Sequence, residues 1–183
     1  MSKAFEFTRQ FFFKWTVNWR FIGEEVFLSK TFSLSLLASH AILLAIFVAF
    51  RWIQPSGKSF TQFMHDVVVR GERFRVPITS SFILATILES LAIGLLYARS
   101  LHYQFFAYLA WASPFLLWEA RFHPVMIFAI WAAQEWAWNV YPSTGISSIV
   151  VVMCLWAQVV GTFRNMRSAE AGSKATGKKL HVQ

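Results

Sequence analysis

The stretch FSLSLLASHAILLAIFVAFRW at residues 32–52 decides the fold class of this chain. It runs for about twenty residues without a charge before Arg51, which is the length that an α-helix needs to cross a bilayer. Four further apolar stretches follow, at residues 80–97, 105–118, 123–138 and 147–163. Because 56% of the 183 residues are hydrophobic and the mean hydropathy is +0.47, the sequence predicts an all-α, polytopic membrane protein with about five transmembrane helices.

The segments that flank this transmembrane domain, residues 32–163, are basic and polar. Residues 1–31 combine Phe and Trp with Lys and Arg, and charged or polar residues such as Lys14 and Arg20 interrupt every apolar run. That pattern excludes a signal peptide and predicts a segment lying in the headgroup zone. Residues 164–183 are rich in Gly, Ser, Ala and Lys without hydrophobic periodicity, so we expect a disordered basic tail.

The distribution of Lys and Arg predicts how the spans are oriented. With five spans, one face of the membrane holds residues 1–31 and the connectors 98–104 and 139–146, which carry six Lys and Arg in all. The other face holds the connection 51–76, Arg121 and the tail, which carry eleven. By the positive-inside rule the second face is cytosolic, so both connectors open on the non-cytosolic side.

The remaining composition excludes several kinds of site. The net charge of +8 comes from residues outside the apolar stretches, which indicates contact with anionic lipid and no nucleic-acid partner. The single Cys154 excludes an internal disulfide and a thiolate metal cluster. No ligands occur at metal-binding spacing on a helix, so we predict no metal site. His65 and Asp66, in the basic connection 51–76, fit an interfacial helix better than a metal site.

Two acidic residues lie inside the apolar stretches, where an unpartnered carboxylate costs about 2.5–3.5 kcal/mol at the centre of the bilayer. Glu89 is either a packing acid, protonated or bonded to Ser90 or a neighbouring helix, or part of a functional site. Glu135 lies about one turn from the non-cytosolic end, and it either lines a site there or has a structural role. His40 is expected to hydrogen bond between helices.

The two non-cytosolic connectors carry larger hydrogen-bonding side chains than a tight turn requires. They read ARSLHYQ at residues 98–104 and WNVYPST at residues 138–144. Arg99 can place its forked donors on a phosphate, and His102 can add a further hydrogen bond. Tyr103, Gln104, Asn139 and Tyr141 suit the hydroxyls of a sugar. The alternative is that Arg99 snorkels, that the aromatic residues form an interfacial belt, and that the second connector is only a turn.

Three long strings at these positions carry a resemblance to a known family. They are FKWTVNWRFIGEEVFLSKTF at residues 13–32, ARSLHYQFFAYLAWASPFLLW at residues 98–118 and QEWAWNVYPST at residues 134–144. The chain resembles the dolichyl-phosphate-mannose-dependent alpha-1,3-mannosyltransferases of the endoplasmic reticulum, in a fungal-like form, over nearly its whole length. That family belongs to the multi-span, lipid-phosphate-sugar-dependent glycosyltransferases, and the matched part is its C-terminal half.

The resemblance implies a function and a set of site residues. Mannose passes from dolichyl-phosphate-mannose, in alpha-1,3 linkage, to the dolichol-pyrophosphate-linked oligosaccharide used for N-glycosylation, on the luminal side of the endoplasmic reticulum membrane. The implied partners are these two lipid-linked substrates and membrane lipids, with no permanently bound cofactor. The implied contacts are Arg99 and His102 for the donor phosphate, Tyr103, Gln104, Glu135, Asn139 and Tyr141 for sugar, and Lys14, Trp15, Asn18 and Arg20 for the acceptor.

The chain departs from the family pattern in one respect. Family members are roughly twice as long or more, and the luminal acid usually taken as their catalytic base lies in an early loop, upstream of the residues matched here. Glu24 and Glu25 match a different part of the pattern. We therefore assign no catalytic residue and expect this chain alone to be inactive.

Two other functions remain open. In a small proton-coupled transporter, Glu89, Glu135 and His102 would form a relay, although the halves of the chain show no convincing self-similarity. In a non-catalytic membrane scaffold, substitutions in the two connectors would be nearly silent.

Overall fold

The computed structural model describes the backbone of residues 10–71 and 78–180, and the side chains of residues 13–71 and 78–165. Within these ranges the chain is helical and has no β-strand, which confirms the all-α class. Expectations that fall on residues 1–9, 72–77 and 181–183 lie outside the described residues.

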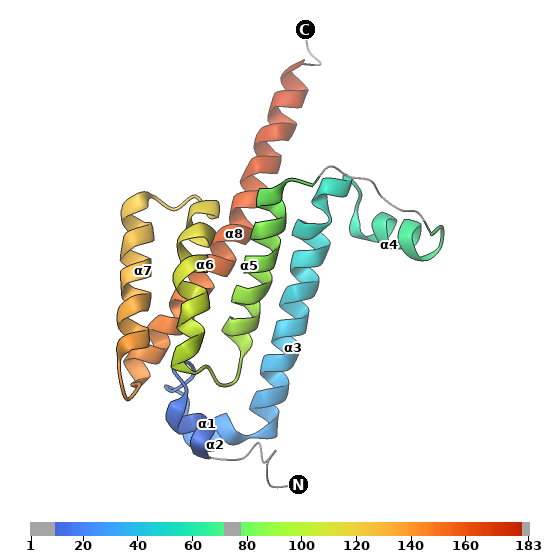
Figure 1. The fold of residues 1–183 in the computed structure, drawn as a ribbon. Coiled ribbons are helices and arrows are strands. Elements are labelled where there is room, and N and C mark those ends of the chain that lie inside the picture. Colours follow the sequence, from blue (N-terminus) through green and yellow to red (C-terminus); the bar gives the residue numbers. More distant parts are fainter. Residues whose placement is uncertain (1–9, 72–77, 181–183) are drawn as a thin grey trace.

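Five long helices form the body of the molecule and run alternately in opposite directions (Figure 1). They are α3 (Lys30–Phe47), α5 (Ser80–Tyr97), α6 (Phe106–Glu119), α7 (Pro124–Asn139) and α8 (Gly145–Leu180). The shorter elements are α1 (Gln10–Trp15), α2 (Glu24–Leu28), the π-helical turn η2 (Val48–Trp52), the 3₁₀ turns η3 (Gln54–Ser56) and η4 (Tyr103–Phe105), and α4 (Phe60–Val68).

Three of the helical segments are long and apolar enough to cross a membrane. They are Lys30–Ser56, Ser80–Tyr97 and Gly145–Asn165. This confirms the polytopic membrane class, whereas α6 and α7 are shorter and the number of spans stays a prediction. Each long helix begins within two residues of the stretch predicted for it.

The helix starts follow local capping chemistry. Ser29 accepts a hydrogen bond from the Phe32 backbone N–H at the start of α3, at 3.1 Å. Thr79 accepts from the Phe82 N–H at the start of α5, at 3.2 Å. These side chains satisfy N–H groups that the first turn of a helix leaves unpaired, so the boundaries are written locally in the sequence.

The core forms around α8, which packs against α5, α6 and α7, while α3 packs against α5. Buried Leu, Val, Ala and Trp side chains from these helices make up one cluster. Within it, the Gln134 Oε1 accepts hydrogen bonds from Ser113 Oγ at 3.1 Å and Gln158 Nε2 at 2.8 Å. These three side chains have no exposed area, and they join α6, α7 and α8 by polar contacts that do not need water.

Glu89 has its partner on a neighbouring helix. Its carboxylate lies 2.5 Å from Arg51 Nη2 and accepts from Arg51 Nε at 2.8 Å and Trp52 Nε1 at 2.9 Å. The π-helical turn η2 brings both donors to α5, and Arg51 also donates to the Thr162 carbonyl on α8 at 2.9 Å. Glu89 is 1% exposed, so this cluster supports the packing interpretation with Arg51, not Ser90, as the partner.

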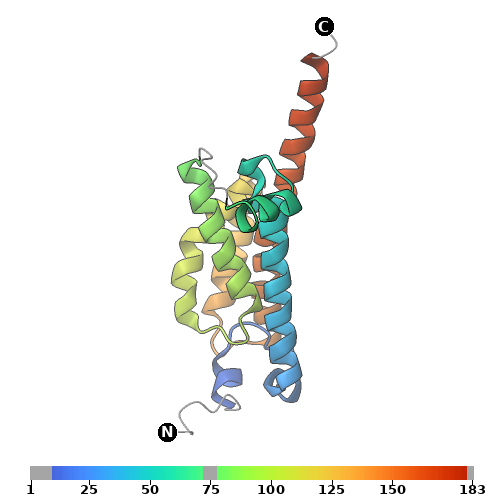
Figure 2. The same ribbon diagram turned by 90° about the vertical axis from the view of Figure 1, so that its right-hand side faces the viewer.

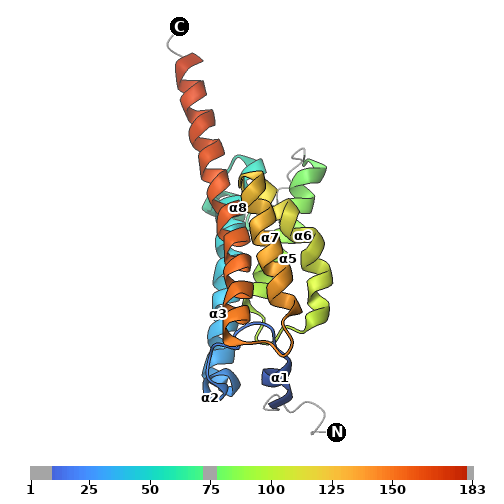
Figure 3. The same cartoon turned by 90° about the vertical axis from the view of Figure 1, so that its left-hand side faces the viewer.

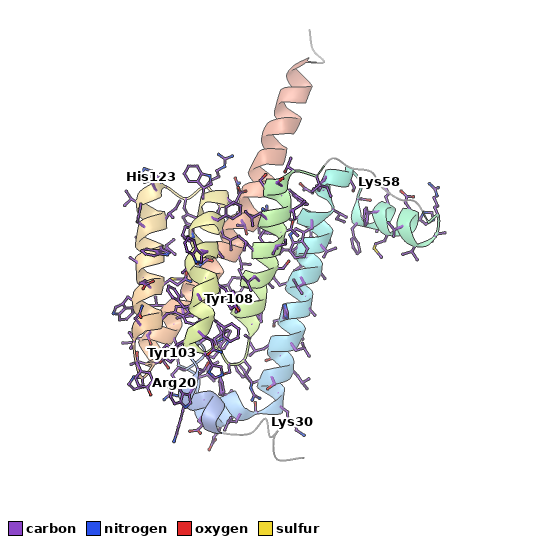
Figure 4. All side chains as sticks on the ribbon, viewed as in Figure 1. Arg20, Lys30, Lys58, Tyr103, Tyr108 and His123 are labelled. Carbon is purple, nitrogen blue, oxygen red and sulfur yellow. The ribbon has the colours of Figure 1, made fainter. Side chains whose placement is uncertain are left out.

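The two ends of the bundle differ in what they carry. Figure 4 places Tyr103, Arg20 and Lys30 at one end and Lys58 and His123 at the other. We name these the connector end and the α4 end. At the connector end, α1 and α2 lie beneath the long helices (Figure 3), together with both polar connectors.

The tail differs from the prediction. The backbone of α8 continues as far as Leu180 and is helical through most of the segment that we expected to be disordered. Lys, Arg, Ala, Glu and Met are good helix formers, and a helix that has already nucleated extends by one hydrogen bond per added residue. The absence of apolar periodicity in residues 164–180 was therefore not sufficient to predict a disordered backbone there.

We predict that Gly161→Ala destabilises the bundle. A Cβ at this position would lie 2.7 Å from the Ala120 Cβ and 2.8 Å from a Phe122 ring carbon, so α8 must shift from the α6–α7 turn. We expect a loss of about 1–3 kcal/mol in the free energy of unfolding in detergent micelles. Gly94→Ala in α5 is the control, because a Cβ there meets nothing within 4 Å. Equal effects of the two substitutions would contradict this packing.

We predict that Arg51→Met is more harmful than the double substitution Arg51→Met with Glu89→Met. The single change leaves the Glu89 carboxylate buried without its cation, a loss of about 3–5 kcal/mol. The double change replaces the pair by apolar side chains of similar volume, which is often neutral. Thermal unfolding of the chain in micelles measures both, and additive losses would show that the pair is not coupled.

Candidate functional site

The N-terminal segment and the first connector are joined by backbone and side-chain hydrogen bonds. The Val17 N–H donates to the Leu101 carbonyl at 2.9 Å. The Leu101 N–H donates to Asn18 Oδ1 at 3.1 Å and to Thr16 Oγ1 at 3.2 Å. Asn18 Nδ2 donates to the Ala98 carbonyl at 2.6 Å, so the one amide holds both ends of this turn.

The second connector joins the same assembly. Ser143 Oγ donates to the Thr16 carbonyl at 2.6 Å, and the Tyr103 hydroxyl donates to the Val140 carbonyl at 3.1 Å. We call residues 16–18, 98–103 and 140–143 the connector junction. The expectation that the two connectors lie at one end of the bundle is met, and the N-terminal segment forms the tie between them (Figure 1).

The junction is dry at its centre. Thr16, Val17 and Asn18 have no exposed area, and Leu101 is 1% exposed. A buried amide or hydroxyl that loses its hydrogen-bond partner costs about 1–3 kcal/mol of stability. Breaking the hydrogen bonds of the junction is therefore unfavourable, because water does not reach these groups. The junction is therefore a rigid base for the side chains that surround it.

An aromatic surface covers one side of the junction. The Tyr141 ring lies 5.9 Å from the Trp15 ring and 5.7 Å from the Tyr103 ring, between centroids. Trp15 is 42% exposed and Tyr141 is 67% exposed, and Gln104 on the first connector is exposed too. The structure thus brings together three predicted sugar-binding and acceptor-binding rings from segments far apart in the sequence, with the Tyr141 ring open to solvent.

The predicted phosphate-binding residues lie on the first connector. Arg99 Nη1 donates to Ser33 Oγ on α3 at 2.8 Å, and the guanidinium carbon lies 5.7 Å from the centre of the Phe27 ring. His102 is half-buried and precedes η4, where its backbone carbonyl, not its side chain, accepts from the Phe105 N–H at 3.0 Å. Arg99 is therefore directed toward the α2–α3 side of the junction, while the aromatic surface lies on the α6–α7 side.

The predicted acceptor residues of the N-terminal segment divide into two groups. Lys14 is exposed, and Arg20 donates to the Phe13 carbonyl and lies over the Phe13 ring with its guanidinium carbon 4.5 Å from the centre. Asn18, in contrast, is fully buried and both ends of its amide are engaged in the turn. Its position differs from the substrate-facing one that we expected, because the turn at Ala98 and Leu101 needs its donor and acceptor.

Glu135 and Asn139 lie on the last turn of α7. The Asn139 amide donates to Glu135 Oε1 at 3.1 Å and to the Glu135 carbonyl at 2.8 Å. Asn139 is exposed and Glu135 is half-buried, so the pair forms a polar edge beside the second connector. Glu89 is held by Arg51 from η2 at the α4 end, while Glu135 lies at the connector end. The two acids therefore do not share the one site that the transporter interpretation requires.

The sequence did not point to several residues that build the site. Thr16, Ser33 and Ser143 all make hydrogen bonds between segments, yet small hydroxyl residues are common at membrane edges and give no motif. The one signal available was the polar break at Thr16 and Asn18 in an aromatic run. Within the described residues, no group of three or more His, Cys, Asp and Glu side chains could hold a metal ion.

The comparisons with known proteins agree on one family. Residues 1–148 match the family described as ALG3 protein. A protein of Neurospora crassa named Dol-P-Man:Man(5)GlcNAc(2)-PP-Dol alpha-1,3-mannosyltransferase is 52% identical over 189 residues, covering 98% of this chain and 43% of that protein. Proteins of the same name from Scheffersomyces stipitis and Homo sapiens are 41% and 39% identical, covering 90% and 84% of this chain and 36% and 35% of their own lengths.

No solved structure matches the chain. The chain spans less than half the length of these curated relatives, at 43%, 36% and 35%. Both the family match and the identity to the relatives run through the segments that meet in the connector junction. The chain therefore belongs to the ALG3 protein family.

Proposed function

We propose that the connector junction forms part of the substrate site of a mannosyltransferase that uses dolichyl-phosphate-mannose as its donor. The relatives from Neurospora crassa and Homo sapiens carry this donor, a lipid-linked oligosaccharide acceptor and an alpha-1,3 linkage in their names. The observation that carries the proposal is the junction itself. Hydrogen bonds tie three segments that are distant in the sequence into one end of the bundle, under exposed aromatic and polar side chains.

The chemistry of such a transfer sets what the site has to supply. A hydroxyl of the acceptor mannose attacks the anomeric carbon of the β-linked mannosyl phosphate, and the bond from that carbon to the phosphate oxygen breaks. The configuration inverts to alpha, dolichyl phosphate leaves with the electron pair, and the hydroxyl proton passes to a base. Cationic donors stabilise the charge that develops on the leaving phosphate. No residue of the junction is assigned as the base.

The residues of the junction divide between these tasks. Arg99 and His102 supply donors for the phosphate, because a guanidinium matches phosphate oxygens with paired N–H groups. Tyr103, Tyr141 and Trp15 supply an amphipathic surface with hydroxyls at its edge, which suits a sugar ring. Gln104, Glu135 and Asn139 add amide and carboxylate groups, and Lys14 and Arg20 add charge for the acceptor pyrophosphate.

The orientation of this end follows from charge. The connector end carries fewer Lys and Arg than the α4 end, so we place it on the luminal face of the endoplasmic reticulum membrane. The apolar faces of the spans then lie in the hydrocarbon, where the dolichol chains of both substrates also lie.

We predict that the substitution equivalent to Arg99→Ala, made in the full-length Neurospora crassa relative, lowers kcat/KM for the mannose donor about 10- to 100-fold. Arg99→Lys keeps the positive charge but not the paired N–H donors. Its kcat/KM should therefore lie between those of the wild-type enzyme and the Ala variant. Mannose transfer by the purified enzyme in micelles measures both.

Arg121→Ala at the equivalent position is the matched control, because Arg121 is exposed on the turn between α6 and α7 at the opposite end. Transfer rates that stay at the wild-type level in the Arg99 variants would contradict the phosphate assignment. They would favour snorkelling of Arg99, with no role of this side chain in binding the donor phosphate.

A further inference from the structure

α4 stands apart from the bundle. It lies between the end of α3 and the start of α5 and runs across the direction of these helices (Figures 1 and 2). The flanking segments Lys30–Ser56 and Ser80–Tyr97 are both long and apolar enough to cross a membrane. Because α4 connects the ends of two such spans, it lies at the level where the bilayer meets water.

The sequence of α4 separates into two faces. Apolar side chains recur at positions i, i+3, i+4 and i+7, which is the spacing of one helical face. They are Phe60, Phe63, Met64 and Val67. The opposite face carries the polar side chains Thr61, Gln62, His65 and Asp66. Apart from Val68, which lies at the border beside Thr61, the two sets occupy separate sides of the helix, as is typical of a helix that lies along a membrane surface.

Only part of the apolar face is covered by the protein. Phe63 lines an apolar pocket of about 350 Å³ together with Trp52 and Phe82 from the ends of the two spans. Phe60, Met64 and Val67 remain 42%, 41% and 39% exposed. These three side chains therefore form an apolar surface that the described part of the protein leaves uncovered.

The start of α4 is fixed by its own residues. Ser59 Oγ accepts from the Gln62 N–H at 3.3 Å, and Gln62 Oε1 accepts from the Ser59 N–H at 3.3 Å. This reciprocal pair is a capping box, which satisfies two N–H groups at the helix start without help from the bundle.

The polar face is basic. Lys58 and Arg70 flank a hollow of about 670 Å³, with Asp66 between them at 2.6 Å from Lys58 Nζ and 3.4 Å from Arg70 Nη1. The hydrogen bond from Lys58 holds the pKa of Asp66 below its usual value, so this carboxylate is ionised at neutral pH. His65 lies on the same face, with its Nδ1 3.6 Å from Asp66 Oδ1.

We propose that α4 is an interfacial helix that binds anionic phospholipid headgroups. Phe60, Met64 and Val67 enter the outer hydrocarbon, and Lys58 and Arg70 reach the headgroup phosphates from the two ends of the helix. An anionic bilayer surface satisfies both faces at once, because it offers hydrocarbon below and negative charge at the level of the basic side chains. Residues 51–76 contain five Lys and Arg against two acids, which is the same charge preference on a larger scale.

Depth measurements on the reconstituted chain test the placement of α4. With Cys154, the one cysteine, replaced by Ala, spin labels are attached at Met64→Cys and at Thr61→Cys in phospholipid nanodiscs. The label at 64 is expected to collide mainly with dissolved oxygen, and the label at 61 mainly with a water-soluble nickel complex. Equal access of the nickel complex to both positions would overturn the proposal, because α4 would then stand clear of the bilayer.

The lipid preference is tested by comparing phosphatidylcholine nanodiscs with nanodiscs that contain phosphatidylserine. The label at 64 is expected to lie deeper with phosphatidylserine, and Lys58→Gln with Arg70→Gln should abolish that difference. Arg121→Gln with Arg164→Gln is the control, because both side chains are exposed cations outside α4. Headgroup binding by α4 would be refuted if the depth difference between the two kinds of nanodisc remained in the Lys58→Gln, Arg70→Gln variant and disappeared in the control variant.

The variant Asp66→Asn separates an effect of charge from unfolding of α4, because its expected effect on the label depth is opposite to that of Lys58→Gln with Arg70→Gln. It keeps Lys58 and Arg70 and removes one negative charge from the polar face, so the label at 64 should move deeper in phosphatidylserine than in the unsubstituted chain. A shallower label in this variant, with the contrast between positions 61 and 64 retained, would show that the charge of α4 does not select the lipid.

Discussion

The structure depends on a small set of buried hydrogen bonds between residues 16–18 and the turn at residues 98–101. Asn18 holds the two ends of that turn, while Val17 pairs with Leu101 through the backbone. None of these three N-terminal residues is exposed, so no bulk water replaces a lost bond. The turn that carries Arg99 and His102 therefore takes its shape from a distant segment, since Asn18 precedes Ala98 by 80 positions in the sequence.

The two ends of the bundle use polar groups for different purposes. At the α4 end, Arg51 and Glu89 are paired inside the protein and fix α3, α5 and α8 against one another. At the connector end, the buried bonds serve as a base, and the side chains above them stay partly exposed, Tyr141 most of all at 67%. A stable interior with open aromatic and polar groups at one end is the arrangement that a substrate site requires.

Much of the fold could be predicted because short, continuous stretches of sequence determine where each long helix begins and ends. Apolar length gave the second span its bounds, and the alternation of five spans placed both connectors at one end. Pairing across helices could not be predicted, because periodicity says which face of a helix is apolar but not which residue opposes it. Glu89 with Arg51, and Asn18 with the turn at Ala98, are both of that kind. The connector residues were named from their chemistry and the N-terminal ones from the family resemblance, but the contacts of Trp15 with Tyr141 and of Arg99 with Ser33 could not be predicted from either.

The central claim is that three distant segments share one surface, and chemical cross-linking tests it most directly. In the structure the rings of Trp15 and Tyr141 lie 5.9 Å apart between centroids, although the two residues are far apart in the sequence. Cysteines at these two positions, in a chain with Cys154→Ala and reconstituted in lipid, should be joined by a short bismaleimide whose spacer bridges two nearby side chains. If the two thiols instead react singly, and membrane-impermeant reagents reach them from opposite sides of the bilayer, the connector junction does not exist.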